Sequence, residues 1–385
     1  MQAKKRFVGI GFGPIQSALF LLEAFRSGNF GRFVVVEVDP AVVAAVRAAG
    51  GRYTVNVAHT DRIEKVTVEG VELLNPTDPA DRAAAVAAIA EADELATALP
   101  SVAFYERGVS ALIAEGLERR TKPAPLLIYT AENHNHAAEH LSAQLGGVSA
   151  AVVNTVIGKM SGVITDAATL DQLGLAELTP GLRRAVLVEA FNRILISAVS
   201  DANIERGIGV FVEKADLLPF EEAKLYGHNA VHAMLGYRAW ERGLTTMAEA
   251  RGHADLMAAA RAAFIDEAGA GLVRKHGGLG DELFTPAGMR AYAEDLLERM
   301  TNPWLHDLVA RVVRDPERKL GYDDRLFVAM RVALAGGVRP MHLARGLAGA
   351  RAAWVGLLGG RWGAAGGDGL AEGVVEAVWG ARDGG

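Results

Sequence analysis

Lysine, asparagine and histidine side chains gather in the nine-residue stretch KLYGHNAVH, which runs from Lys224 to His232. On a helix that advances roughly 100° per residue, three polar groups lie roughly 40°, 80° and 140° from Lys224. In that order they are His228, His232 and Asn229. A buried lysine whose pKa is lowered can act as a general base near neutral pH. A solvated helix face has the same spacing, because lysine and asparagine usually point to water. Spacing alone therefore leaves an active site and a surface helix both open.

A glycine-rich turn near the N-terminus has the form of a nucleotide site. In RFVGIGFGPIQSALFLLEAF a strand-like run leads into a helix, and Gly11, Gly13 and Gln16 occupy the glycine positions of a G-x-G-x-x-G motif. Gly11 permits a tight turn, Gly13 lets the backbone approach a pyrophosphate, and the helix N-terminus supplies N–H groups to an anion. Two departures weaken the motif, since Gln16 replaces the third glycine and Pro14 brings no N–H. The motif alone leaves a purely structural turn as the alternative.

Two carboxylates at the end of the next strand-like run strengthen the nucleotide interpretation. RFVVVEVDP carries Glu37 and Asp39 where a dinucleotide-binding fold places a carboxylate on the adenosine ribose hydroxyls. A carboxylate there repels the extra phosphate of NADP, and no arginine follows at once, so we predict NAD as the cofactor. Asp39 stands before a proline and has the alternative role of a helix cap. The remaining residues that we assign to the cofactor site are Pro14, Ile15, Thr97 and Ala98.

The order of apolar runs predicts an α/β protein. Through the first half, short β-branched runs alternate with Ala- and Leu-rich helical segments, which is typical of an open sheet with helices on both faces. YTVNV, EKVTVEGVEL and AVLVEAFNRILIS are counted among its strands. After about Ser200 the apolar spacing becomes helical and stays so. We therefore predict a Rossmann-type doubly wound domain over residues 1–200 and a mainly α-helical substrate and catalytic domain over residues 201–385.

Composition argues against several classes of protein. At 385 residues the chain is long for one hydrophobic core. Its net charge of -6 gives no electrostatic reason to bind nucleic acid or an anionic membrane. No apolar stretch reaches the roughly 20 residues that span a bilayer, so we expect a cytoplasmic protein. The absence of cysteine excludes disulfides, thiol nucleophiles and cysteine-ligated zinc. His136 and His140 lack the glutamate of a zincin motif, so we expect no metal site. We expect a monomer or a weak homodimer.

Several motifs, in the same order along the chain, resemble one enzyme family. KLYGHNAVH fits K-x-x-x-x-N-x-x-H, the signature of the polyol-specific long-chain dehydrogenases, or mannitol dehydrogenase family. TAEN (Thr130–Asn133), TNPWLHD (Thr301–Asp307) and DPERKLGYDDRL (Asp315–Leu326) stand at the places of three further family motifs. The similarity runs from GIGFGPIQ to about Leu347. In length and motifs the chain is similar to the members that act on mannitol 1-phosphate.

The resemblance implies a metal-independent, NAD-dependent oxidoreductase that interconverts a polyol phosphate and a ketose phosphate. The expected pair is mannitol 1-phosphate and fructose 6-phosphate, or a close analogue. Lys224 would be the general base that takes the substrate hydroxyl proton as hydride leaves for the nicotinamide. Asn229 and Asn133 would donate hydrogen bonds to the developing alkoxide, and His232 would orient the reacting oxygen. His228 stands at a wildcard position, so we interpret it as a neighbour of the site.

Two features bear on the choice of substrate. VIGKMSG has Gly158 and Lys159 where family members commonly have an acid and an arginine, although Lys159 could still supply a positive charge. Our candidates for binding a substrate phosphate are Lys159, Arg318, Lys319 and Arg325. Ion pairs on helix surfaces are the alternative interpretation of the ERK and DDR segments. A free polyol dehydrogenase or a hexuronate reductase of the same family stays open. A non-catalytic sensor of a nucleotide or sugar phosphate is disfavoured by the retained signature.

Overall fold

The computed structural model describes residues 4–146, 150–199, 201, 204–321 and 323–352. By compactness the chain divides into two units, Met1–Leu218 and Pro219–Gly385, which we call unit 1 and unit 2. The predicted functional division after residue 200 stays a prediction, and residues 353–385 of its second part lie outside the described residues. Within the described ranges, every helix is too short or too polar to cross a membrane.

Unit 1 is built on an eight-stranded sheet whose order is β12-β11-β8-β7-β6-β1-β2-β5. Its strands are β1 (Lys5–Ile10), β2 (Phe30–Val36), β5 (Val71–Leu74), β6 (Glu94–Thr97), β7 (Leu126–Thr130), β8 (Ala150–Val156), β11 (Ile194–Ser197) and β12 (Phe211–Lys214). Neighbours are parallel from β8 to β5, whereas β11 is antiparallel to β8. The chain proceeds from β1 first to one side and then to the other, so the predicted doubly wound sheet is confirmed.

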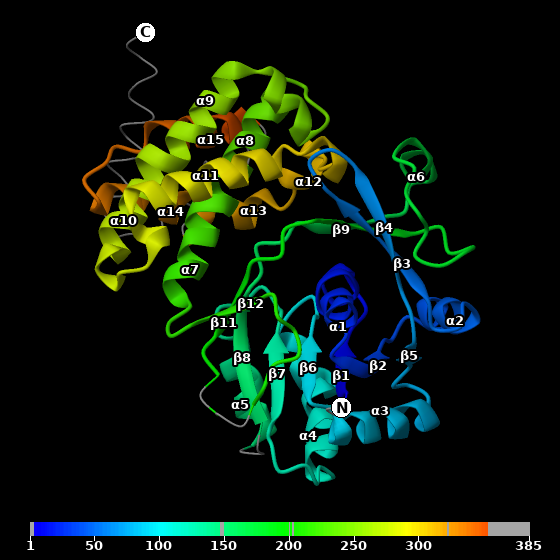
Figure 1. Ribbon diagram of the computed structural model, residues 1–385. Coiled ribbons are helices and arrows are strands. Elements are labelled where there is room, and N and C mark those ends of the chain that lie inside the picture. The colour runs from blue at the N-terminus through cyan, green and yellow to red at the C-terminus, as the bar shows by residue number, and fades with distance from the viewer. Residues whose placement is uncertain (1–3, 147–149, 200, 202–203, 322, 353–385) are drawn as a thin grey trace, which may run out of the picture. The chain divides into compact units, whose positions relative to one another are not determined.

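Apolar side chains on both faces of this sheet explain why helices cover both. Alternate residues of a strand point to opposite faces, so Phe7 and Val8 of β1 belong to different cores. The core around Phe7 includes α1 (Leu21–Ser27), whereas the core around Val8 includes α3 (Pro79–Glu91) and α4 (Ser110–Glu118). Figure 1 shows α1 on one side of the sheet and α3 and α4 on the other. The other α-helices of unit 1 are α2 (Pro40–Ala48), α5 (Ala137–Leu145) and α6 (Ala167–Gln172).

Part of the predicted open sheet is a separate four-stranded sheet of order β4-β3-β10-β9. YTVNV is β3 (Tyr53–Ala58), and it forms an antiparallel hairpin with β4 (Ile63–Val68) instead of joining the main sheet. Counting EKVTVEGVEL as one strand is wrong, because Gly70, with φ of +74°, turns the chain between β4 and β5. AVLVEAFNRILIS is likewise two strands, β10 (Ala185–Glu189) in this sheet and β11 in the main one. The fourth strand is β9 (Ser161–Ile164).

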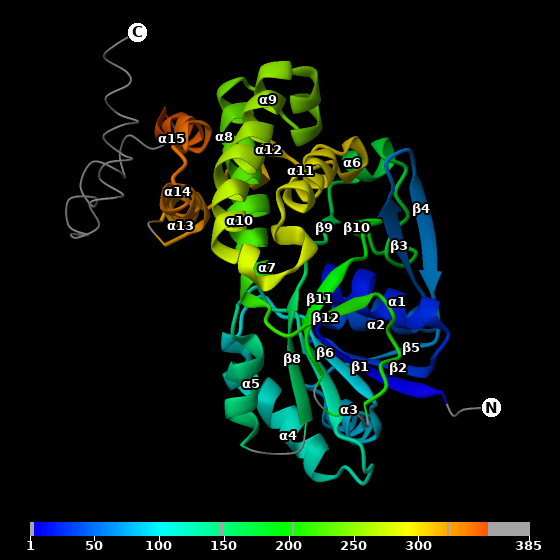
Figure 2. The same ribbon diagram turned by 60° about the vertical axis from the view of Figure 1, so that its left-hand side comes forward.

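Within its described residues, unit 2 is mainly helical, as predicted, and its β-structure is an isolated bridge between Thr246 and Leu308. One continuous helical stretch consists of α7 (Leu218–Glu222), the π-helix η3 (Ala223–Asn229) and α8 (Ala230–Glu241). Further helices of unit 2 are η5 (Ala263–Gly269), α10 (Ala270–His276), α11 (Pro286–Met300), α12 (Val309–Val312), α13 (Pro316–Lys319), α14 (Arg325–Ala335) and α15 (Met341–Ala352). Helix α14 packs against both η3 and α8. Helix α15 also packs against α8 (Figure 2).

Candidate active site

The glycine turn after β1 requires glycine at its first position. Gly11 has φ of +86°, a left-handed conformation that other residues rarely adopt, and a Cβ atom there would lie 2.8 Å from the carbonyl oxygen of Ala98. Ala98 donates its N–H to the carbonyl of Ile10 at 3.0 Å, which joins the ends of β1 and β6. At Gly13 a Cβ atom would meet nothing within 4 Å, so the backbone is open on that side. The turn therefore has the tight bend and the accessible backbone that a pyrophosphate site needs.

Gln16, which replaces the third glycine of the motif, is buried against β1. A Cβ atom at Gly9 would lie 2.3 Å from Gln16 Nε2, so the glutamine side chain fills space that this strand glycine leaves. Within the described part of the chain, both polar atoms of the Gln16 amide are buried without a hydrogen-bond partner. Pro14 and Ile15 begin the helix, where the missing N–H of proline costs nothing. Helix and strand pack closely because Gly9 takes over the role of the third glycine.

Glu37 connects the glycine turn to the end of β2. Its carboxylate accepts one hydrogen bond from the N–H of Phe12 at 2.7 Å and another from the N–H of Asp39 at 2.8 Å. Each oxygen keeps a lone pair for a further donor, as a ribose hydroxyl would supply. Asp39 accepts from the N–H of Ala41 at 3.0 Å as the N-cap of α2, and Arg184 lies 3.5 Å from its carboxylate. Asp39 is therefore the cap of α2, and its role in the cofactor site stays a prediction.

Thr97 and Asn133 lie at the carboxyl ends of two neighbouring parallel strands of unit 1. Thr97 ends β6, and Asn133 follows β7. Thr97 is the last residue of β6 and pairs with Thr130, the last residue of β7. Asn133 follows three residues after Thr130 and is exposed, whereas Glu132 before it is buried and accepts a hydrogen bond from the Thr97 hydroxyl at 3.0 Å. Both segments leave the carboxyl edge of the sheet, where ligands bind in open α/β sheets. Glu132 has no role in our sequence analysis, although TAEN contains it.

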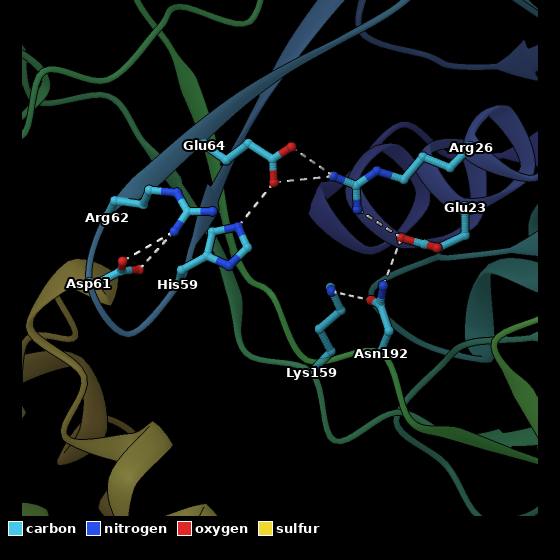
Figure 3. Close-up of polar contacts among 8 residues, drawn as sticks. All are labelled: Glu23, Arg26, His59, Asp61, Arg62, Glu64, Lys159 and Asn192. Carbon is cyan, nitrogen blue, oxygen red and sulfur yellow. Dashed lines mark hydrogen bonds and ion pairs between the residues drawn. The ribbon is translucent and has the colours of Figure 1, made fainter.

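Lys159 is held inside unit 1 by groups of its own unit. Its side chain is only 6% exposed, and its ammonium donates to the carbonyl of Phe191 at 2.7 Å and to Asn192 Oδ1 at 2.6 Å. Asn192 in turn donates to Glu23 of α1 at 2.9 Å, so polar contacts connect Lys159 to that helix (Figure 3). A contact with a substrate phosphate would therefore have to compete with these hydrogen bonds. The other three candidate phosphate ligands belong to unit 2.

The KLYGHNAVH stretch is helical, but a regular α-helical projection does not describe it. Residues 223–229 form the π-helix η3, whose hydrogen bonds widen the turn, and such segments are frequent at functional sites. Lys224 and Asn229 lie within η3, and His232 lies in the first turn of α8. Gly227 allows close packing here, because a Cβ atom at this position would lie 2.7 Å from the ring of Phe264 in η5.

Lys224 has the lowered pKa that general base catalysis needs. Burial lowers the pKa of Lys224 to about 8, and the positive charge of Arg325 acts in the same direction. The negative charge of Glu221, one helical turn earlier, raises the pKa and only partly offsets these effects. Lysine with this pKa exchanges a proton close to neutral pH. Glu221 and Arg325 both lie outside the KLYGHNAVH motif, so the motif alone does not indicate their effects on the pKa of Lys224.

His232 is held by a buried carboxylate that our sequence analysis does not single out. His232 Nε2 lies 3.0 Å from Asp307 Oδ2, and the other Asp307 oxygen accepts from Arg311 Nε at 2.8 Å. Burial by itself would raise the pKa of Asp307, but His232 and Arg311 outweigh it and the pKa is lowered. Because an ionised carboxylate only accepts hydrogen bonds, Nε2 of His232 carries the hydrogen and Nδ1 is left for another partner. The position of Asp307 at the end of TNPWLHD is the available sequence signal.

His228 is buried next to these groups. Burial lowers the pKa of His228 well below its usual value, and the charges of His232, Arg299, Lys224 and Arg325 act in the same direction. The imidazole is therefore neutral at physiological pH. Its ring lies 6.0 Å from that of His232, and its Nδ1 is buried without a hydrogen-bond partner among the described residues.

The predicted basic cluster of unit 2 combines a surface ion pair with buried cations. Arg318 is exposed and lies 3.7 Å from Asp324, which fits the ion-pair interpretation. Arg325, by contrast, has a side chain only 12% exposed and donates to Asp324 at 2.7 Å. Lys319 is buried and donates to the carbonyl of Val312 at 2.6 Å. Burial lowers the pKa of Lys319 to about 8, helped by Arg325 and Arg318. The charge of Arg325 thus acts on both lysines.

Comparison with known proteins adds an independent line of evidence. Residues 216–354 match the family model of the mannitol dehydrogenase C-terminal domain. A mannitol-1-phosphate 5-dehydrogenase from Bacillus licheniformis is 31% identical over 344 residues, which cover 84% of this chain and 85% of that protein. D-sorbitol dehydrogenase in its substrate-free form has a TM-score of 0.69 at 14% identity and covers 90% of this chain and 79% of its own. Mannitol 2-dehydrogenase from Pseudomonas fluorescens, solved with NAD and D-mannitol, has a TM-score of 0.64 at 17% identity, with coverages of 90% and 78%. These structural likenesses establish the fold.

Proposed function

The chain belongs to the mannitol dehydrogenase family of oxidoreductases, and from this we propose that it is an NAD-dependent polyol phosphate dehydrogenase. The proposed reaction interconverts mannitol 1-phosphate and fructose 6-phosphate, or a close analogue. The observation that carries the proposal is Lys224, which stands in the family signature and has a pKa lowered to about 8. The relative from Bacillus licheniformis supports the phosphorylated substrate by its name.

The residues of unit 1 fit a bound dinucleotide. Gly11 and Gly13 provide the tight turn and the open backbone for a pyrophosphate, and Glu37 has free lone pairs for the ribose hydroxyls. The Glu37 carboxylate disfavours the additional phosphate of NADP, which supports NAD. When bound, NAD supplies the acceptor for the hydride that leaves the substrate carbon.

Proton transfer is the part of the reaction that we assign to Lys224. In its neutral form the lysine takes the hydroxyl proton of the polyol, and in the reverse direction the charged form returns a proton to the ketose oxygen. We assign to Asn229 and Asn133 the donation of hydrogen bonds to the developing alkoxide. His232, oriented by Asp307, binds the reacting oxygen. This mechanism uses no metal ion.

The substrate phosphate is assigned to Arg325, with Lys319 and Arg318 as further members of the cluster. The low exposure of the Arg325 side chain and its electrostatic effect on Lys224 support this choice. Lys159 is the weaker candidate, since its ammonium already donates to Phe191 and Asn192. A free polyol dehydrogenase or a hexuronate reductase would need no phosphate site but would keep Lys224.

A substrate panel tests the proposal directly. We expect NADH absorbance to rise with mannitol 1-phosphate and NAD far faster than with unphosphorylated mannitol. Hexuronates with NADH form the third arm, and NADP replaces NAD in a fourth. Preference for free mannitol would move the protein to the free polyol dehydrogenases, and preference for a hexuronate would make it a reductase. A protein that binds NAD but turns over none of these substrates would contradict the proposed enzyme.

A further inference from the structure

Glu132 is a buried carboxylate at the edge of the sheet where the candidate site residues of unit 1 gather. Glu132 directly precedes Asn133 in the chain and is 4% exposed. A buried carboxylate is costly unless several donors stabilise it. Burial raises the pKa of Glu132, and the hydrogen bonds that it accepts partly offset that rise.

Three donors converge on this carboxylate from the neighbouring strand and the segment that follows it. The N–H of Leu99 donates to Oε1 at 3.0 Å, and the Thr97 hydroxyl donates to Oε2 at 3.0 Å. The hydroxyl of Tyr105 also donates to Oε2. Alongside them, the N–H of Ala131 donates to the carbonyl of Thr97 at 2.9 Å. The segment after β7 is therefore connected to residues 97–105 by the Glu132 side chain and by one backbone hydrogen bond.

Both sides of this connection carry residues of the proposed reaction. Residues 97 and 98 belong to the proposed cofactor site, and the carbonyl of Ala98 lies against the Gly11 turn. On the other side, the backbone of Glu132 continues directly into Asn133, the proposed donor to the alkoxide. A shift of Glu132 would therefore displace Asn133 relative to the cofactor segment.

We propose that Glu132 is a positioning residue that holds Asn133 in register with the cofactor-binding segment Thr97–Leu99. The inference rests on the proposed function, because it gives Glu132 an effect on turnover through Asn133. Glu132 need not touch substrate or cofactor for this role.

Glu94 of β6, the strand next to β7, provides a matched control for Glu132. It is 1% exposed, begins β6, and accepts hydrogen bonds from the Tyr129 hydroxyl at 2.9 Å and from the N–H of Gly207. Burial raises its pKa as well. Glu94 and Thr97 are the two ends of β6, so Glu94 lies at the amino end and Glu132 acts at the carboxyl end. Loss of Glu94 removes a comparable buried carboxylate away from the proposed site.

The test is a double-mutant cycle on the full chain with Glu132→Ala, Asn133→Ala and the double variant. Removing one preorganised hydrogen-bond donor to a developing oxyanion typically lowers kcat by about 10²- to 10³-fold, and a misplacement of about 1 Å can lower it by about 10²-fold. If Glu132 acts through Asn133, the double variant will have nearly the kcat of Asn133→Ala alone. Glu94→Ala should lower the melting temperature as Glu132→Ala does but leave kcat near that of the wild type.

Rescue by a conservative variant separates positioning from charge. Glu132→Gln can still accept from Leu99 and can donate to the two hydroxyls, so it should retain far more turnover than Glu132→Ala. If Glu132→Ala does not fold, the same cycle with Tyr105→Phe replaces it. Multiplicative effects on kcat in either cycle, or an equal loss of kcat in Glu94→Ala, would overturn the positioning role alone. Unchanged kcat in Asn133→Ala would instead overturn the proposed role of Asn133, and the coupling with it.

Discussion

If Lys224 is the general base, replacing it, or replacing the nearby charges of Arg325 and Glu221, should change how kcat depends on pH. With a pKa of about 8, the Lys224 side chain is neutral in about a quarter of molecules at pH 7.5. At the ordinary pKa of 10.5 that fraction would be about one in a thousand. The environment of Lys224 therefore increases the population of the base form by about two orders of magnitude at this pH.

Polyol oxidation needs the neutral lysine, so kcat in that direction should rise with pH through an inflection near 8. Lys224→Ala should lower kcat by about 10²- to 10⁴-fold and abolish the inflection. Lys224→Arg should be similarly inactive, because its guanidinium stays protonated. Binding of NAD, measured by fluorescence titration, should survive in both variants. Lys65→Ala, which changes an exposed lysine of β4, is the control.

The two neighbouring charges should shift the inflection of kcat in opposite directions along the pH axis. A structural defect would not produce such opposite shifts. Arg325 lowers the pKa of Lys224, so Arg325→Met should move the inflection to higher pH. Glu221 raises that pKa, so Glu221→Gln should move the inflection to lower pH. The assay is initial NADH formation at saturating substrate from pH 6 to 10. An inflection that persists in Lys224→Ala, or shifts of the same sign in both charge variants, would refute the role of Lys224.

Four further outcomes are expected. Wild-type protein should have a higher kcat/KM with NAD than with NADP, and Glu37→Ser should narrow that ratio; equal use of both cofactors by the wild type would contradict the assignment. Arg325→Ala should raise KM for mannitol 1-phosphate more than for mannitol, because only the phosphate loses a charge-assisted contact; equal increases would remove Arg325 from the phosphate site. Asp307→Asn should lower the free energy of unfolding at neutral pH, since the folded-state pKa of Asp307 is depressed. That stability is present above the unfolded pKa of about 3.9 and is lost as pH falls through the folded pKa, so the two melting temperatures should converge in acid. Equal melting temperatures at neutral pH would contradict a stabilising role of the pair. Prolonged chelator treatment should leave turnover unchanged, and a loss restored by zinc would contradict the metal-independent mechanism.

Local patterns of apolar residues were sufficient to predict that strands and helices alternate in unit 1 and that unit 2 is mainly helical. Alternation of apolar residues reports that a segment such as YTVNV is a strand, but not which strand it pairs with. The assignment of β3 and β4 to the main sheet is therefore wrong, because pairing depends on a hairpin and on β10, far along the chain. AVLVEAFNRILIS likewise contains two strands, and only the packed structure sends them to different sheets.

The identities of the candidate residues come from the sequence, whereas their chemical state depends on residues distant in the chain. Lys224 and His232 stand in a short motif, but the motif contains neither the charge of Arg325 nor the carboxylate of Asp307. Glu132, which follows β7, accepts a hydrogen bond from Tyr105, which follows the neighbouring strand β6. Gln16 fits only because β1 has a glycine opposite it. Sequence motifs thus determined which groups are available for chemistry. Burial and electrostatic interactions, which depend on three-dimensional distance, were decided by the tertiary structure alone.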